Sequence, residues 1–312
     1  MPKFSKISTK APEKLDKEET KLKTAKILEK IGELQNVFFA QGKYSLLIVL
    51  QGLDASGKDG VVKNVFSGLN PLGVDVRAYK APTEEERQYD FLWRIHKNVP
   101  SQGMIMLFNR SHYEDVLVPA VEKWIDKDHV KRRFEHINNF ERLLQEENNT
   151  IILKFYLHIS KEKQHEKLIE RKNNPEKFWK HSDGDWETSK KWDDYMQAYE
   201  DVFSACNKPE WEIIPADQNW YKEYRIAKRV LETLEKLHLE YPKLTTALPL
   251  KMAEKVKYEI SQKVKATEKV AEKSSKKPTE KPKQKAPERV SIRVSTEPFN
   301  EVKPRKKPTK KS

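Results

Sequence analysis

The sequence predicts an α/β fold with a parallel β-sheet covered by helices on both faces, and three observations lead to this prediction. Short apolar, β-branched runs alternate along the chain with segments of helical periodicity. The first such run, residues 44–50, is apolar throughout, as in a strand buried on both faces. It leads through the glycine-rich segment GLDASGK into a helical pattern, which indicates a strand–loop–helix unit.

The remaining elements follow in chain order. The first helix is expected at residues 15–40, where apolar residues recur at intervals of three or four. Strands are expected at residues 44–50, 74–79, 104–108 and 151–158, and a short one ends at 213–215. Helices are expected at residues 59–69, 84–97, from about 112, 135–147, 160–172 and 220–237. Residues 172–206 mix aromatic residues with both charges, and their position after the fourth strand predicts a helical lid.

The net charge of +13 is concentrated at the carboxyl end. Residues 263–312 carry 17 Lys or Arg and 6 Asp or Glu, a net +11, which leaves +2 for the rest of the chain. Segments such as KKPTEKPKQKAPERV bury too little apolar surface to order themselves, so residues 250–312 are predicted to be a disordered Lys-rich tail. Residues 1–14 are also expected to be disordered, which leaves 15–249 as the folded domain.

Composition indicates a cytoplasmic protein without membrane association. Only 37% of residues are hydrophobic and 35% are charged. No apolar run reaches the roughly 18 residues of a transmembrane helix. The N-terminus lacks the apolar core of a secretory signal, and the single Cys206 excludes an intrachain disulfide.

Residues 52–58, GLDASGK, fit the first seven positions of the phosphate-binding P-loop pattern. Glycines let the backbone amides point inward, the following helix contributes positive potential at its N-terminus, and Lys58 adds a point charge. The alternative is a glycine-rich turn without a ligand.

The loop carries two carboxylates of its own. Asp59 stands where the usual pattern has the Ser or Thr that ligates Mg²⁺, and Asp54 lies inside the loop. A carboxylate beside phosphate is repulsive unless a cation lies between them, so Asp54 is predicted to ligate magnesium; the alternative is that it caps the following helix. Asp59 is expected to favour the helix dipole.

A polar cluster directly follows the third strand, in the sequence NRSHYED. Ligands of open α/β sheets bind at the carboxyl ends of the strands. Glu114 and Asp115 are therefore candidate magnesium ligands, and Arg110 is a candidate phosphate contact. The alternative is a solvent-exposed helix start whose acids complement the dipole.

Two further segments supply candidate phosphate contacts. After the second strand, Thr83 and Glu86 are explained fully by a capping box, which leaves Lys80 free to contact phosphate. In the predicted lid, Arg171 and Lys180 stand among several lysines and tryptophans; a solvated helix face is the alternative for these charges.

Together these stretches resemble the polyphosphate kinase 2 family. The resemblance rests on GLDASGKDG at 52–60, KAPTEEE at 80–86, FNRSHYEDVLV at 108–118, NNFERLL at 138–144, ERKNNPEKFWK at 170–180 and IPADQNWYKEYRI at 214–226. It covers about residues 20–242, and the segment NRSHYEDVLV is similar to the family's third class, which phosphorylates both AMP and ADP.

The resemblance implies a three-layer αβα P-loop kinase fold with a helical lid, like that of thymidylate kinase. It implies reversible, Mg²⁺-dependent transfer (with Mn²⁺ as a substitute) of the terminal phosphoryl group of inorganic polyphosphate to AMP and ADP, with GMP and GDP as further acceptors. It also implies a homo-oligomer, a dimer or tetramer, and no specific nucleic acid. An ATP-dependent nucleoside monophosphate kinase and a polyanion-binding or nucleic-acid-binding protein acting through the basic tail are the alternatives.

The expected site residues fall into three groups. The catalytic positions are Asp54, Lys58, Arg110, Asp115 and Arg171. The phosphate or nucleotide contacts are Gly52, Ala55, Ser56, Gly57, Lys58, Asp59, Gly60, Lys80, Asn109, Arg110, Glu114 and Lys180. The metal ligands are Asp54, Glu114 and Asp115.

Overall fold

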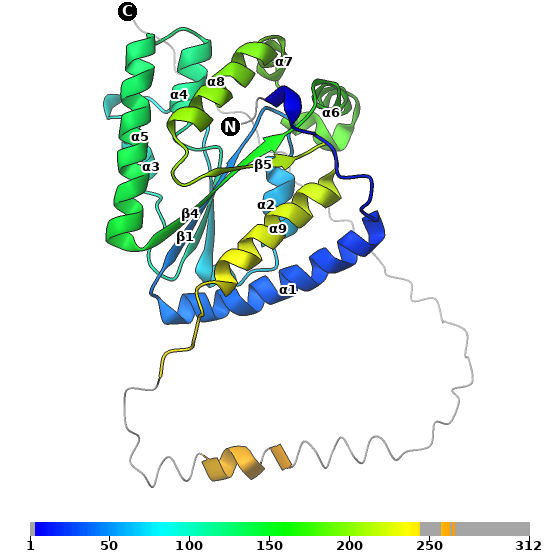
Figure 1. Cartoon of the computed structure of the whole chain (residues 1–312), viewed down its shortest axis with the longest axis vertical. Coiled ribbons are helices and arrows are strands. Elements are labelled where there is room, and N and C mark those ends of the chain that lie inside the picture. Colours follow the sequence, from blue (N-terminus) through cyan, green and yellow to red (C-terminus); the bar gives the residue numbers. More distant parts are fainter. Residues whose placement is uncertain (1–3, 244–256, 263, 266–312) are drawn as a thin grey trace, which may run out of the picture. The chain divides into compact units, whose positions relative to one another are not determined.

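A parallel five-stranded sheet forms the centre of the computed structural model, which describes residues 4–243, 257–262, 264 and 265 (Figure 1). The strand order is β2-β3-β1-β4-β5, and every neighbouring pair is parallel. The strands are β1 (Ser45–Gln51), β2 (Val74–Ala78), β3 (Ile105–Asn109), β4 (Thr150–His158) and β5 (Trp211–Pro215). This arrangement confirms the α/β class and the parallel sheet predicted from the alternating pattern.

The central strand β1 explains the apolar run of the sequence. It pairs with β3 on one side, Leu46 opposite Ile105, and with β4 on the other. All seven of its residues are buried. Leu46 and Ile48 face one core cluster, while Leu47 and Val49 face the other, so both faces of the strand are covered.

Helices cover each face of the sheet as separate layers (Figure 1). One layer contains α1 (Lys17–Gln41), α2 (Lys58–Phe66) and α9 (Asn219–Glu235). The other contains α3 (Trp93–His96), α4 (Glu114–Val121), α5 (Lys127–Asn148) and α8 (Trp192–Ala205). The chain also forms α6 (Lys161–Asn173), α7 (Asp183–Lys190) and the 3₁₀ turns η1 (Phe4–Lys6), η2 (Pro71–Gly73), η3 (Glu86–Gln88) and η4 (Pro175–Lys180).

The helix predicted at residues 84–97 is wrong in its extent. Only the turn η3 and the single helical turn α3 form there. Between them the Asp90 side chain accepts a hydrogen bond from the backbone N–H of Leu92 at 2.9 Å. Such a local side-chain bond offers the backbone an alternative to continuing the helix. The capping box is confirmed, because Thr83 and Glu86 exchange backbone–side-chain hydrogen bonds at 3.0 and 3.1 Å.

The prediction that residues 1–14 are disordered is wrong for residues 4–14. Phe4 is 6% exposed, and its ring packs on Tyr156 and Phe203 with centroid distances of 5.0 and 5.4 Å. Farther along, the Thr9 hydroxyl donates to Asp217 at 2.8 Å. One buried aromatic ring and a few hydrogen bonds are enough to hold a segment of low overall hydrophobicity.

The chain divides into two compact units, residues 1–243 and 244–312. In the second unit the structure describes helical residues 257–262 together with 264 and 265. The tail predicted at 250–312 therefore lies mostly outside the described residues. Within the described residues, no helix is both long enough and apolar enough to cross a bilayer.

Candidate active site

The loop between β1 and α2 has the backbone of a phosphate-binding loop. Gly52 and Gly57 have φ angles of 148° and 95°, and Ala55 has a φ of 63°, so the chain turns repeatedly through the left-handed region. A Cβ at Gly52 would lie 2.9 Å from the Leu157 carbonyl oxygen, so only glycine fits there. Helix α2 starts at Lys58 with Gly57 as its N-cap and no side-chain cap, which leaves its first amides for an anion.

Lys58 folds back over this loop. Its side-chain Nζ donates to the carbonyl oxygens of Gly52 at 2.6 Å and Leu53 at 3.1 Å. Burial, and then the nearby Arg110 guanidinium, lower the pKa of Lys58 to about 8. Its ammonium group is therefore held at the loop without a carboxylate bonded to it, as phosphate binding requires.

Of the remaining loop positions, Ser56 is fully buried with its hydroxyl unpaired. Gly60 lies within the first turn of α2, where a Cβ would meet nothing within 4 Å. Gly60 therefore has no close-approach requirement of the kind seen at Gly52.

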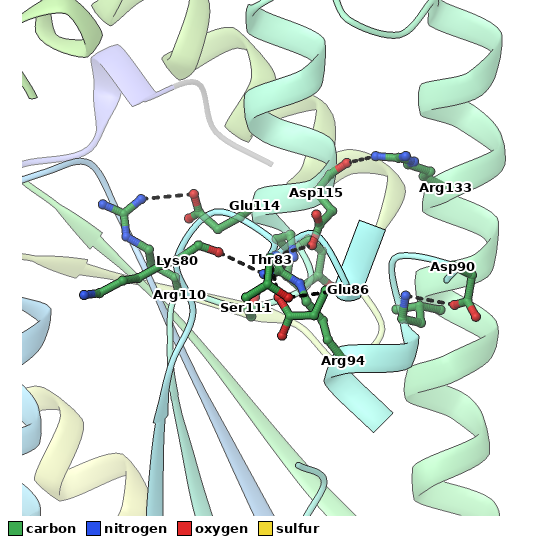
Figure 2. A network of polar contacts seen from close by, with 12 residues as sticks. Lys80, Thr83, Glu86, Asp90, Arg94, Arg110, Ser111, Glu114, Asp115 and Arg133 are labelled. Atoms are coloured by element: carbon green, nitrogen blue, oxygen red, sulfur yellow. Dashed lines mark hydrogen bonds and ion pairs between the residues drawn. The ribbon is translucent and has the colours of Figure 1, made fainter. Parts of the chain in front are cut away.

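Arg110 lies at the centre of the site. Its guanidinium donates to the carboxylate of Asp54, from the loop. It also donates to Glu114 at 3.1 Å (Figure 2). Arg110 has a φ of 64°, and its backbone N–H donates to Leu50 of β1 at 3.0 Å. A left-handed non-glycine residue is strained, and such strain clusters at functional sites. Asp54 does not cap α2; its carboxylate faces Arg110 instead.

A cavity of about 220 Å³ opens beside this cluster. It is lined by Gly52, Leu53, Asp54, Arg110, Glu114, Leu117, Val118, Glu122, Trp124, Thr188, Tyr195 and Tyr199. The loop, the residues after β3 and the helices α4, α7 and α8 thus all contribute to one concave site.

Asn109 and Lys180 both bind Asp59. The Asn109 amide and the Lys180 ammonium each donate to the Asp59 carboxylate at 2.9 Å. Burial alone would raise the pKa of Asp59, but these two bonds outweigh it and hold the pKa below its usual value. The charged Asp59 therefore connects the P-loop helix to the turn η4 in the predicted lid.

Asp115 lies in a different hydrogen-bond network from Asp54 and Glu114, and its role as a metal ligand stays a prediction. Its carboxylate accepts from Arg94 at 2.9 Å, and its backbone carbonyl accepts from Arg133 (Figure 2). Burial raises the pKa of Asp115 despite the Arg94 partner. Asp115 does not line the cavity, because adjacent helical residues point in different directions.

Arg94 also connects Lys80 to this network. Its guanidinium donates to the backbone carbonyl of Lys80 at 2.8 Å. The side chain of Lys80 makes no hydrogen bond in the described part of the chain. In Figure 2 it extends to the same side as the Arg110 side chain. Lys80 therefore keeps its predicted freedom to contact phosphate.

The segment predicted as a lid, residues 172–206, contains parts that pack differently. Arg171 pairs with Asp185 at 2.7 Å, which joins the end of α6 to α7. Helix α8, by contrast, buries Tyr199, Val202 and Phe203 in the main core. The boundary at residue 206 is wrong, because the aromatic residues of α8 pack against the sheet and cannot leave it without exposing the core.

Sequence reasoning missed two lysines beside the loop, Lys167 and Lys222. Lys222 is 1% exposed and donates to the carbonyl oxygen of Ser56 at 3.2 Å. A signal for it exists, because Lys222 falls on the apolar face of α9, in line with Ile226 and Val230. A lysine on a buried helix face needs a reason to be there.

Comparisons with known proteins establish the family. The family model for polyphosphate kinase 2 matches residues 14–242. The chain belongs to the polyphosphate kinase 2 family. The "AMP/ADP-polyphosphate phosphotransferase" of Meiothermus ruber is 45% identical over 220 residues, 70% of this chain and 82% of that protein. The "ADP-polyphosphate phosphotransferase" of Rhodopseudomonas palustris is 38% identical over 234 residues, 70% of this chain and 81% of that protein.

A solved structure gives the same architecture. The polyphosphate kinase 2 of Arthrobacter aurescens superimposes with a TM-score of 0.76 and 37% identity, covering 81% of this chain and 92% of the other. The match supports the P-loop kinase α/β fold expected from the motifs.

Proposed function

We propose that this protein transfers the terminal phosphoryl group of inorganic polyphosphate to AMP and to ADP. The observation that carries the proposal is the meeting of the P-loop, Lys58 and the Asp54–Arg110–Glu114 cluster at one cavity. Support comes from the family membership and from relatives whose names state this reaction.

The residues act by positioning and by charge neutralisation. The loop amides and Lys58 hold the phosphates of the donor, and Arg110 faces the phosphoryl group in transfer. A phosphate oxygen of AMP or ADP attacks the terminal phosphorus as the bond to the bridging oxygen breaks, and the shortened polyphosphate leaves. The attacking oxygen already carries negative charge, so no general base is needed.

Asp54 and Glu114 fit a magnesium ion. Both are hard oxygen donors at the cavity, and Mg²⁺ is usually held by one or two carboxylates together with substrate phosphates. Within the described residues no group of three or more His, Cys, Asp or Glu side chains is placed to hold a metal ion by itself. The ion would neutralise phosphate charge at the cavity. Mn²⁺ as a substitute, GMP and GDP as acceptors, the homo-oligomer and the cytoplasmic location stay predictions.

One mixture tests the donor. Purified protein, Mg²⁺, long-chain polyphosphate and AMP are combined without ATP, and nucleotides are followed by chromatography. We expect ADP and then ATP to form. Formation of ATP from ADP alone would restrict the acceptor, and a requirement for added ATP would replace the proposal with an ATP-dependent monophosphate kinase.

Two variants locate the activity. Lys58→Ala should lower turnover by about 10²–10³-fold, as the loss of one preorganised charge contact does. Truncation after residue 249 should leave turnover intact, because the residues that line the cavity all lie within 52–199. Loss of turnover on truncation would favour the basic tail as the polyanion-binding element.

A further inference from the structure

Lys222 is a buried cation that has no carboxylate partner among the residues that the structure describes. Its ammonium group donates to Ser56 O at 3.2 Å and to Asn219 Oδ1 at 3.1 Å, and both acceptors are neutral. An ammonium group has three donors, so one remains. Burying a charge without a counter-charge is costly, and proteins normally avoid it by pairing.

A second lysine converges on the same point. A Cβ built on Gly57 would overlap the Lys222 ammonium and lie 3.8 Å from the Nζ of Lys167 on α6. Glycine at position 57 is therefore needed for the close approach of the Lys222 ammonium, and the Lys167 ammonium lies beside the same point. In the described part of the chain, Lys167 makes no hydrogen bond and no ion pair. The two ammonium groups repel each other, because both carry positive charge. An anion bound between them would attract both, so the electrostatic energy of the site would become favourable.

We infer that Lys167 and Lys222 extend the phosphate-binding loop into a second anion position, which holds the phosphoryl unit of the polyphosphate chain next to the unit at Lys58. The inference rests on the proposed function for the identity of the anion. Lys167 is half-buried and reaches the chain directly. Lys222 is a positioning residue that keeps the Ser56 carbonyl turned to its own ammonium group and adds positive charge beneath the anion.

The titration of Lys222 agrees with this role. Burial, and then Lys167, lower the pKa of Lys222 to about 7, so near neutral pH the free protein holds this proton only in part. A bound polyanion favours the charged form, so binding should take up a proton. The other charged groups that act on the two lysines are Lys58 of α2, Lys163, Glu166 and Arg171 of α6, Asp217 before α9 and Glu223 of α9.

Titration calorimetry with sodium tripolyphosphate tests the inference without turnover. Wild type, Lys222→Met, Lys222→Arg and Lys167→Met are titrated at pH 7.5 in two buffers of different ionisation enthalpy. Lys228→Met is the matched control, because Lys228 lies on the same helix with its side chain 51% exposed. We expect about tenfold weaker binding for Lys222→Met and Lys167→Met. Lys222→Arg and Lys228→Met should bind as wild type. The proton uptake should be lost most completely in Lys222→Met and Lys222→Arg, and it should be unchanged in Lys228→Met.

A titration with orthophosphate distinguishes binding at the second anion position from binding at the P-loop. The two methionine variants should bind orthophosphate as wild type does, because one phosphoryl unit fills only the position at Lys58. Equal losses for orthophosphate and tripolyphosphate, or wild-type tripolyphosphate binding in both variants, would overturn the inference. If the wild-type protein bound tripolyphosphate but never phosphorylated AMP or ADP, the proposed function would be contradicted. The inference of a second anion position would not be affected by that result.

Discussion

Lys154 and Lys222 are buried to the same extent, each 1% exposed, but their partners differ. The Lys154 ammonium donates to Glu141 at 2.8 Å, and to Tyr113 and the Cys206 carbonyl at 3.0 Å each. All its donors are used and its charge is balanced inside the core. In the described part of the chain, the Lys222 ammonium donates only to neutral oxygens. Charge balance thus distinguishes a cation that completes the core from a cation that faces a ligand.

The carboxylate in the balanced network is charged. Burial alone would raise the pKa of Glu141, but the hydrogen bond from His112 and the charge of Lys154 outweigh burial and lower the pKa. The network lies directly beneath the segment after β3, because His112 and Tyr113 both bond to Glu141. It therefore supports the backbone that presents Arg110 and Glu114 to the cavity.

The largest expected effect comes from unbalancing this core pair. Lys154→Met should lower the free energy of unfolding by about 3–5 kcal/mol, because it leaves the buried Glu141 carboxylate without its cation. Urea denaturation measures the loss. The double variant Lys154→Met, Glu141→Leu should recover more than half of it, since an apolar pair carries no uncompensated charge. A double variant as unstable as the single one would contradict the charge-balance explanation.

Asp54 and Asp115 are expected to differ in the same way, one acting on the ligand and the other on stability. Asp54→Asn should lower turnover by about 10²-fold and raise the Mg²⁺ concentration needed for half-maximal activity, while stability stays within about 0.5 kcal/mol. Asp115→Asn should instead lower the free energy of unfolding by about 1–3 kcal/mol, because the buried Arg94 loses the closer of its two carboxylate partners. A shift in Mg²⁺ dependence with Asp115→Asn equal to that of Asp54→Asn would return Asp115 to the metal site.

The sequence predicted the sheet and the P-loop because their signals are local. Glycine spacing and an uninterrupted apolar run are visible within about ten residues. The separation of Glu114 from Asp115 was not predictable in this way. The two are neighbours in sequence, and their roles differ because Arg94 arrives from a distant helix. Phe4 and the core residues of α8 were missed for a related reason, since tertiary packing decides whether a weakly apolar segment orders.

Replacing Lys222, whose charge is not balanced, should change the free energy of unfolding in the opposite direction to Lys154→Met. Lys222→Met should raise the free energy of unfolding at pH 7 by about 1–2 kcal/mol, because it removes a desolvated charge and loses only two weak hydrogen bonds. The folded-state pKa of about 7 lies below the ordinary lysine value of 10.5, so the unfolded chain binds more protons between these values. Wild-type stability therefore rises with pH across this window.

The pH dependence separates this effect from a general change in packing. The gain from Lys222→Met should be largest below pH 7 and shrink toward pH 10.5, as thermal unfolding across pH would show. Lys228→Met provides the comparison, because its exposed ammonium carries little desolvation cost. A gain that is independent of pH would mean that the methionine packs better, with no buried charge involved.

The smallest expected effect concerns the exposed pair that joins the lid to the P-loop helix. Lys180 and Asp59 meet at 2.9 Å with side chains 30% and 60% exposed, and such surface pairs contribute about 0.2–1 kcal/mol. Lys180→Met should therefore raise the KM for polyphosphate by only about two- to fivefold, with kcat nearly unchanged. Lys190→Met on α7, an equally charged but more exposed position, serves as the control. High salt should weaken the wild type toward the Lys180→Met value, because screening acts on the same pair. A tenfold or larger loss of kcat would show that Lys180 touches the phosphoryl group in transfer.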